Sequence, residues 1–170
     1  MPTTLCSPSC RHERWLTPVL QLNAPPLRPR PRRVLIADDD AFVRASLAAV
    51  LRSEGFQVEE AEDGAQAVAL ATRQAPDLVL LDLNMPRLDG WAAFTRLQCR
   101  RPLVPVIVIT ARPHQYEEAV RLGVDAFMEK PLNIGLLVRA ARQLSAAEDD
   151  VPDRRYPYRN SGTWFLGHED

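Results

Sequence analysis

Polar side chains follow several apolar runs of the sequence, at the point where each run ends. Asp38, Asp39 and Asp40 come directly after "VLIA", Asp82 comes directly after "LVLL", and Thr110 ends "VIVIT". Aspartate is a poor strand residue, and burying its carboxylate without a partner costs stability. We therefore expect other groups of the chain, or a bound ion, to compensate these charges.

A cation is the compensating group that these residue types favour. Three or four carboxylates at one place cannot all ionise without strong mutual repulsion. No His or Cys is interleaved with them, so the ligands are all oxygen atoms, which suits Mg²⁺. Lys130, after "FME", adds a positive charge, and Thr110 adds a hydroxyl. A carboxylate beside Mg²⁺, a lysine and a hydroxyl can accept a phosphoryl group, and we expect Asp82 to be that nucleophile.

The elements that would bring these residues together alternate along the chain. Short apolar runs predict strands, and apolar residues at helical spacing predict helices. Strands are expected over 33–37, 56–61, 77–82, 104–110 and 124–129, and helices over 41–55, 63–76, 90–100, 113–123 and 131–147. Five strand–helix pairs with short loops predict an α/β fold, a five-stranded parallel doubly wound sheet flanked by five helices. The strand ends would share one edge of this sheet, so the polar residues would form one site.

The composition is that of an ordinary globular protein. Of 170 residues, 46% are hydrophobic and 25% are charged, with a net charge of −1, which does not favour a nucleic-acid coat. The three cysteines are odd in number, so a reducing compartment is favoured over a disulfide framework. Cys6, Cys10 and His12 could suggest zinc, but they lack the usual ligand spacing. No apolar run is long enough for a membrane span, so we expect a cytoplasmic protein without membrane association.

Both ends of the sequence differ from its middle. Residues 1–32 are rich in Pro and Arg and are expected to form a disordered arm, and 148–170 are expected to form a short flexible tail. The folded unit is expected over 33–147. The arginines of 28–33 could contact nucleic acid or anionic lipid, although a solvated arm is favoured. The aromatic stretch 154–165 could dock on a partner or on its own domain, and an unstructured tail is slightly favoured.

Four motifs resemble those of the receiver domain of two-component response regulators, which has the chemotaxis-type fold. They occur in the family's order and at its spacings: "VLIADDD" (34–40), "LLDLNMPRLDG" (80–90), "VIVITA" (106–111) and "FMEKP" (127–131). The resemblance covers about 33–147. It implies a flavodoxin-like sheet with the strand order 2-1-3-4-5.

The resemblance also implies the acidic part of the site. Asp82 would be the phosphoacceptor. Asp38 and Asp39 would be the acidic pair that holds Mg²⁺, Asp39 directly and Asp38 mainly through water. Asp82 and the backbone carbonyl of Asn84 would complete the metal ligands. Because three aspartates are consecutive, the register could shift by one, and Asp40 is interpreted as the N-cap of the first helix.

The remaining family positions would respond to the phosphoryl group. Thr110 would hydrogen-bond it, and Lys130 would form an ion pair with it. Phe127 matches the aromatic switch position, although it lacks the hydroxyl or imidazole of many relatives. The Lys130–Pro131 peptide bond would be cis, as is usual in the family.

The function that the resemblance implies is signalling, not enzymatic catalysis. The chain would accept a phosphoryl group on Asp82 from a histidine kinase or phosphotransfer protein and signal to a downstream protein by conformational change. The alternative is a Mg²⁺-dependent phosphohydrolase with Asp82 as nucleophile. Such enzymes normally place a second Asp two residues later, where this chain has Asn84. Because the tail is short and acidic, we expect a stand-alone regulator without specific DNA binding, as a monomer or a phosphorylation-dependent dimer.

Overall fold

The computed structural model describes residues 30–146 and 164–165. The rest of the expected arm and most of the expected tail lie outside the described residues, as do Cys6, Cys10 and His12. Among the described residues, no helix combines the length and the apolar character needed to cross a membrane.

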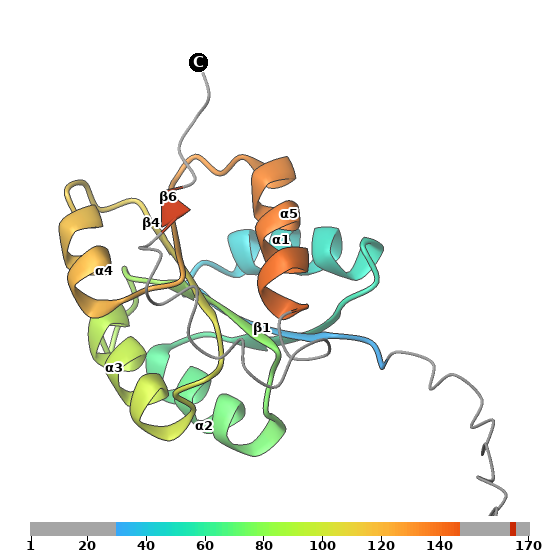
Figure 1. The fold of residues 1–170 in the computed structure, drawn as a ribbon, viewed down its shortest axis with the longest axis horizontal. Helices are drawn as coiled ribbons and strands as arrows, with labels where there is room; N and C mark the ends of the chain where they lie inside the picture. The colour runs from blue at the N-terminus through green and yellow to red at the C-terminus, as the bar shows by residue number, and fades with distance from the viewer. Residues whose placement is uncertain (1–29, 147–163, 166–170) are drawn as a thin grey trace, which may run out of the picture.

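The described chain alternates strands and helices around one parallel sheet (Figure 1). The elements are β1 (Arg33–Ala37), α1 (Ala41–Ser53), β2 (Gln57–Ala61), α2 (Gly64–Gln74), β3 (Leu78–Asp82), α3 (Gly90–Arg100), β4 (Val106–Thr110), α4 (Tyr116–Leu122), β5 (Ala126–Glu129), α5 (Ile134–Ser145) and β6 (Trp164–Phe165). The order across the sheet is β2-β1-β3-β4-β5-β6. The expected order of the first five strands is therefore confirmed. The sixth strand, on the outer edge of β5, was not predicted.

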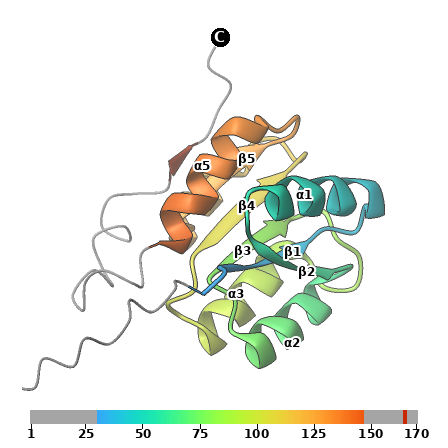
Figure 2. The same ribbon diagram turned by 90° about the vertical axis from the view of Figure 1, so that its right-hand side faces the viewer.

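Helices cover both faces of the sheet (Figure 2). Helices α1 and α5 pack on one face, where their buried leucines and alanines join Val34 and Ile36 of β1 in one apolar cluster. Helices α2, α3 and α4 pack on the other face, where they join Leu35 and Ala37 in a second cluster. Successive side chains of β1 thus pack alternately into the two clusters, as expected for a strand that is buried on both faces.

Local backbone interactions determine where helices α1 and α4 begin. The side chain of Asp40 caps α1, because its Oδ1 accepts the backbone N–H groups of Phe42 at 2.8 Å and Val43 at 3.3 Å. The interpretation of Asp40 as N-cap is therefore confirmed. The helix expected over 113–123 is shorter and begins at Tyr116, because His114 has a left-handed φ of 58° in the turn before it.

The last residues before β1 are tied to the domain. The buried carboxylate of Asp77 accepts two hydrogen bonds from the Arg30 guanidinium, at 2.9 Å and 2.6 Å, and one from the backbone N–H of Arg33 at 2.7 Å. Arg32 also donates to the carbonyl of Ser145, at the end of α5. The described end of the arm therefore contacts the folded unit.

Glycine is required where α3 meets the end of β3. A Cβ added at Gly90 would lie 2.5 Å from the carbonyl oxygen of Asp82 and 2.5 Å from the Cα of Leu83. These atoms belong to the backbone and cannot move aside without displacing Asp82.

We predict that Gly90→Ala destabilises the fold by about 2–3 kcal/mol, because overpacking at a backbone contact forces the helix away from the strand. Gly135→Ala in α5 is the matched control, since its Cβ would meet only the Asn133 Oδ1, at 3.4 Å. The control should be neutral or stabilise by about 0.5–1 kcal/mol, because alanine favours a helix. Urea unfolding of both variants measures the difference, and equal stabilities would contradict the close approach.

Candidate functional site

Three carboxylates meet at the carboxyl ends of β1 and β3. Asp38 and Asp82 are both only 2% exposed, whereas Asp39 is exposed to solvent. One carboxylate oxygen from each of Asp38, Asp39 and Asp82 lies within 4.8 Å of the other two. The structure therefore brings together the three acidic side chains that the sequence singled out as metal ligands, while Asp40 is used as a helix cap.

The sheet register explains why these side chains meet. Strands β1 and β3 are neighbours, and Ala37 of β1 pairs with Leu81 of β3. The residues that follow this pair are Asp38 and Asp82, which therefore lie side by side. A further hydrogen bond, from the Asp40 backbone N–H to the Asp38 Oδ1 at 2.9 Å, holds the Asp38 carboxylate in place.

Lys130 reaches the acidic cluster from the loop after β5. Its Nζ lies 2.9 Å from the Asp38 Oδ2 and 3.5 Å from the Asp82 Oδ1. The Asp82 Oδ1 is buried and accepts no hydrogen bond in the structure. A buried carboxylate oxygen without a hydrogen bond is costly, so this atom is the strongest candidate for contact with a bound ligand.

The charges of the cluster perturb two pKa values. Burial raises the pKa of the Asp82 carboxyl above its ordinary value; the Lys130 ammonium opposes this change, and the carboxylates of Asp38 and Asp39 add to it. Burial acts to lower the pKa of Lys130, but its hydrogen bond to Asp38 and the negative charges of Asp82 and Asp38 outweigh burial, and the pKa is raised. Lys130 thus remains a cation, one positive charge beside three carboxyl groups.

Thr110 and Phe127 lie on the strands beside the cluster. Thr110 ends β4 and is fully buried, and its Oγ1 accepts the backbone N–H of Arg112 at 2.9 Å. Phe127 lies in β5 and is also fully buried, within the apolar layer under α2, α3 and α4. Its ring contacts Tyr116 of α4, with the centroids 6.0 Å apart and an interplanar angle of 63°. Phe127 therefore belongs to the core between site and surface and is not part of the acidic cluster.

Asn84 and Pro131 complete the expected set. Asn84 is exposed, its backbone N–H donates to the Asp82 carboxylate, and its side-chain Oδ1 accepts the Arg112 Nε at 3.3 Å. The Lys130–Pro131 peptide bond is cis, as the resemblance implies.

Sequence reasoning missed Arg112. Besides Asn84, this side chain contacts the Asp89 Oδ1 through its Nη1, at 3.2 Å, and so links two loops at the rim of the cluster. The available signal was its position two residues after Thr110, at the end of a strand that carries a site residue.

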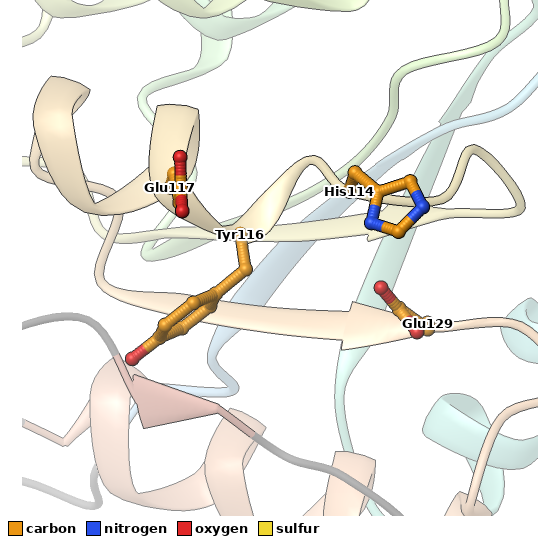
Figure 3. Close-up of a pocket in the computed structure, with 4 residues that line it drawn as sticks. All are labelled: His114, Tyr116, Glu117 and Glu129. Carbon is orange, nitrogen blue, oxygen red and sulfur yellow. The ribbon is translucent and has the colours of Figure 1, made fainter.

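A pocket of about 500 Å³ lies on the neighbouring face, between the start of α4 and the end of β5. His114, Tyr116, Glu117 and Glu129 line it, as Figure 3 shows. Glu129 pairs with Thr110 in the sheet and directly precedes Lys130, so one wall of the pocket belongs to the strand that leads into the cationic residue of the site.

Comparisons with known proteins agree with this geometry. The family model of the response regulator receiver domain matches residues 34–142. The receiver domain of Francisella response regulator 1452 is similar, with 27% identity and a TM-score of 0.64, over 68% of this chain and 97% of that one. The receiver domain of NtrX from Brucella abortus is 31% identical, with a TM-score of 0.63, over 66% of this chain and 98% of that one.

Two similar curated proteins come from Mycobacterium tuberculosis. Transcriptional regulatory protein PdtaR of Mycobacterium tuberculosis is 41% identical over 131 residues, which cover 71% of this chain and 63% of that protein. Transcriptional regulatory protein PrrA of the same organism is 42% identical over 114 residues, which cover 66% of this chain and 49% of that protein. The chain thus spans about half to two thirds of the length of these relatives.

These relatives overturn one expectation. The prediction of a regulator without specific DNA binding rested on the few residues after α5 and on their negative charge. Proteins that are 41% and 42% identical to this chain are named as transcriptional regulators, so that prediction is wrong. The physical reason is that the length and charge of the residues after α5 do not determine the output of a receiver domain.

The family model matches the part of the chain that holds the acidic cluster, Thr110 and Lys130. The similar structures share the same fold. The chain therefore belongs to the response regulator receiver domain family of two-component signalling proteins.

Proposed function

We propose that the receiver domain, residues 33–147, accepts a phosphoryl group on Asp82 from a phosphohistidine of a histidine kinase or phosphotransfer protein. The observation that carries this proposal is the buried Asp82 Oδ1, which accepts no hydrogen bond and lies 3.5 Å from the Lys130 Nζ. In the transfer, an Asp82 oxygen forms a bond to phosphorus while the bond between phosphorus and the donor nitrogen breaks. The products are an aspartyl phosphate and a free imidazole, whose leaving nitrogen takes up a proton from the solvent.

The acidic cluster fits Mg²⁺. Its donors are all carboxylate oxygens, they lie within 4.8 Å of one another, and Lys130 compensates only part of their charge. Asp38, Asp39 and Asp82 would hold the ion, together with the backbone carbonyl of Asn84. Bound Mg²⁺ supplies positive charge that offsets the charge of the phosphoryl oxygens. Mg²⁺ rather than a softer metal is part of the proposal because no nitrogen or sulfur ligand belongs to the cluster.

Lys130 and Thr110 would then hold the transferred group. Lys130 is paired mainly with Asp38, at 2.9 Å, and a phosphoryl group on Asp82 offers this ammonium a stronger anionic partner. The Thr110 Oγ1 already accepts a hydrogen bond from Arg112, so its own O–H proton is available to donate to a phosphoryl oxygen. Movement of Thr110 would displace Phe127 on the neighbouring strand and, through it, Tyr116. Phosphorylation of Asp82 could thereby change the surface of the domain.

A phosphohydrolase is the weaker alternative. Its second acidic residue would stand at Asn84, whose side-chain amide cannot exchange a proton as a general acid or base. We therefore propose a signalling protein and not a hydrolase. We place it in the cytoplasm as part of the same proposal. Because the relatives are named as transcriptional regulators, we extend the proposal to an output in transcription.

The test is phosphorylation by acetyl phosphate with Mg²⁺, followed by intact mass measurement. We expect the mass of one phosphoryl group to be added, to be lost on treatment with hydroxylamine, and to be absent when EDTA replaces Mg²⁺. Labelling that is unchanged in EDTA, or that resists hydroxylamine, would contradict a metal-dependent aspartyl phosphate.

Replacing Asp39 should weaken Mg²⁺ binding far more than replacing Asp40. We expect Asp39→Ala to lower the Mg²⁺ affinity more than about tenfold, because one of three carboxylate ligands is lost. Asp40→Ala is the matched control, since it should cost about 1 kcal/mol of stability through the lost N-cap and leave Mg²⁺ affinity nearly unchanged. Magnesium titration followed by NMR measures both, and a larger loss for Asp40→Ala would show that the register is shifted by one.

A further inference from the structure

The outer edge of β5 is covered by a distant part of the same chain. On its inner side β5 pairs with β4, from Ile107 opposite Ala126 to Thr110 opposite Glu129. On its outer side it pairs in parallel with β6, with Trp164 opposite Ala126 and Phe165 opposite Phe127. Figure 3 shows β6 as the short arrow alongside β5, near Tyr116. Without β6, β5 would be an edge strand of the described sheet.

An uncovered β5 edge would attract another strand. An edge strand presents a row of backbone N–H and C=O groups that are not paired within the sheet, and such a row is a template for an added strand. The attraction is stronger for an apolar strand, and Ala126, Phe127 and Met128 are all buried. Without β6, the outer edge of β5 would therefore combine backbone groups that have no partner strand with an apolar sequence.

The edge belongs to the strand that serves the acidic site. Residue 130 follows β5 directly, and its backbone N–H donates to the Thr110 carbonyl at 2.8 Å. The side chain of Phe127 packs against Tyr116 of α4. A strand that pairs with β5 thus lies next to the strand that leads into Lys130 and that makes the ring contact with α4.

The chain between α5 and β6 is long enough for this arrangement. A parallel neighbour of β5 must begin at the end of the sheet where β5 begins, and α5 already carries the chain back to that end, because the Ser145 carbonyl contacts Arg32 just before β1. The 12 residues of α5 are roughly 18 Å long at 1.5 Å per residue. Residues 146–163 could span roughly 60 Å when fully extended.

We propose that the outer edge of β5 is a strand-docking surface and that residues 164–165 of this chain are its resident occupant. The surface fits an extended segment that runs parallel to β5. A protein that binds this face by adding a strand must first displace β6, so the segment acts as a built-in competitor. The proposal does not depend on phosphorylation, and it can fail or hold whatever the outcome at Asp82.

The test uses the full chain and measures hydrogen exchange of the β5 amides by NMR. Phe165→Pro removes a backbone N–H and restricts the backbone in β6, and His168→Pro, outside the pair, is the matched control. Among Ala126, Phe127 and Met128, we expect the amide that points away from β4 to exchange about tenfold faster in Phe165→Pro. The same amide should keep its rate in the control, and the β1 amides should keep theirs in both.

A peptide in trans identifies the occupant. A synthetic peptide with the sequence of residues 160–170, "NSGTWFLGHED", should restore slow exchange in Phe165→Pro, and the same peptide with proline at the position of Phe165 should not. Unchanged exchange in Phe165→Pro would overturn the proposal. If sedimentation then shows a dimer, a second copy covers the edge; if it shows a monomer, β6 does not protect it.

Discussion

Asp82→Asn is expected to abolish phosphorylation by acetyl phosphate while making the fold more stable. The acyl phosphate requires a carboxylate oxygen as nucleophile, and an amide in the same place does not supply one. The substitution also removes a buried negative charge from a cluster in which Asp38 and Asp39 repel it. We expect the free energy of unfolding at neutral pH, in EDTA, to rise by about 1–2 kcal/mol, the order of cost of an unsatisfied buried polar group.

The pH dependence of that gain has a definite sign. Burial raises the pKa of Asp82 in the folded protein, so at neutral pH the ionised form is less favourable in the folded than in the unfolded chain. This penalty is relieved as the pH falls through the raised pKa, because the folded protein then binds the proton. The advantage of Asp82→Asn should therefore be largest at neutral pH and shrink in acid. Asp40→Asn is the control, since asparagine also caps helices well, and it should change neither labelling nor stability appreciably.

The arrangement of strands could be predicted because each strand ends in a recognisable place. Residues 34–37, 78–81 and 106–109 are all apolar, as expected for strands buried on both faces, and they lie in three central strands, β1, β3 and β4. Because the strands are parallel, their carboxyl ends lie at one edge of the sheet. This alone was enough to predict that Asp38 and Asp82 lie together.

The details that could not be predicted depend on side-chain packing or on segments without a pattern. The sequence predicts that Lys130 lies near the carboxylates. It does not predict that Lys130 lies closer to Asp38, at 2.9 Å, than to Asp82, at 3.5 Å. The contact of Arg112 with Asn84 likewise joins two loops that are far apart in sequence.

Strand β6 illustrates a different limit. Trp164 and Phe165 belong to a short stretch without alternation, so periodicity offers no signal for two paired residues. Both residue types favour strands, but two residues are too few to predict one, and their pairing depends on the neighbouring strand β5. Tertiary structure therefore decided this element, whereas local pattern decided the first five strands.

Lys130→Ala is expected to have the opposite effect on stability from Asp82→Asn, although both change the same cluster. Removing the ammonium leaves the buried carboxylates of Asp38 and Asp82 without their nearest cation. We expect a loss of about 2–4 kcal/mol at neutral pH in EDTA, somewhat below the cost of breaking a fully buried ion pair, because the Lys130 side chain is 23% exposed. The loss should diminish as the pH falls, since protonation of the carboxyls removes their repulsion. Arg121→Ala, which removes an exposed cation paired with Glu118, is the control and should change stability little.

The same variant should separate phosphorylation from the conformational response. Asp82, Asp38 and Asp39 keep the nucleophile and the proposed metal ligands, so labelling by acetyl phosphate should survive in part, with a rate lowered roughly tenfold by the loss of one cation. The phosphoryl group would then lack the partner that draws β5 toward it. NMR shifts of Phe127 and Tyr116 on phosphorylation, clear in the unmodified protein and in Arg121→Ala, should therefore be lost in Lys130→Ala. Normal shifts at these two residues in Lys130→Ala would show that the signal reaches the surface through Thr110 alone. The charge of Lys130 would then serve only to neutralise the acidic cluster.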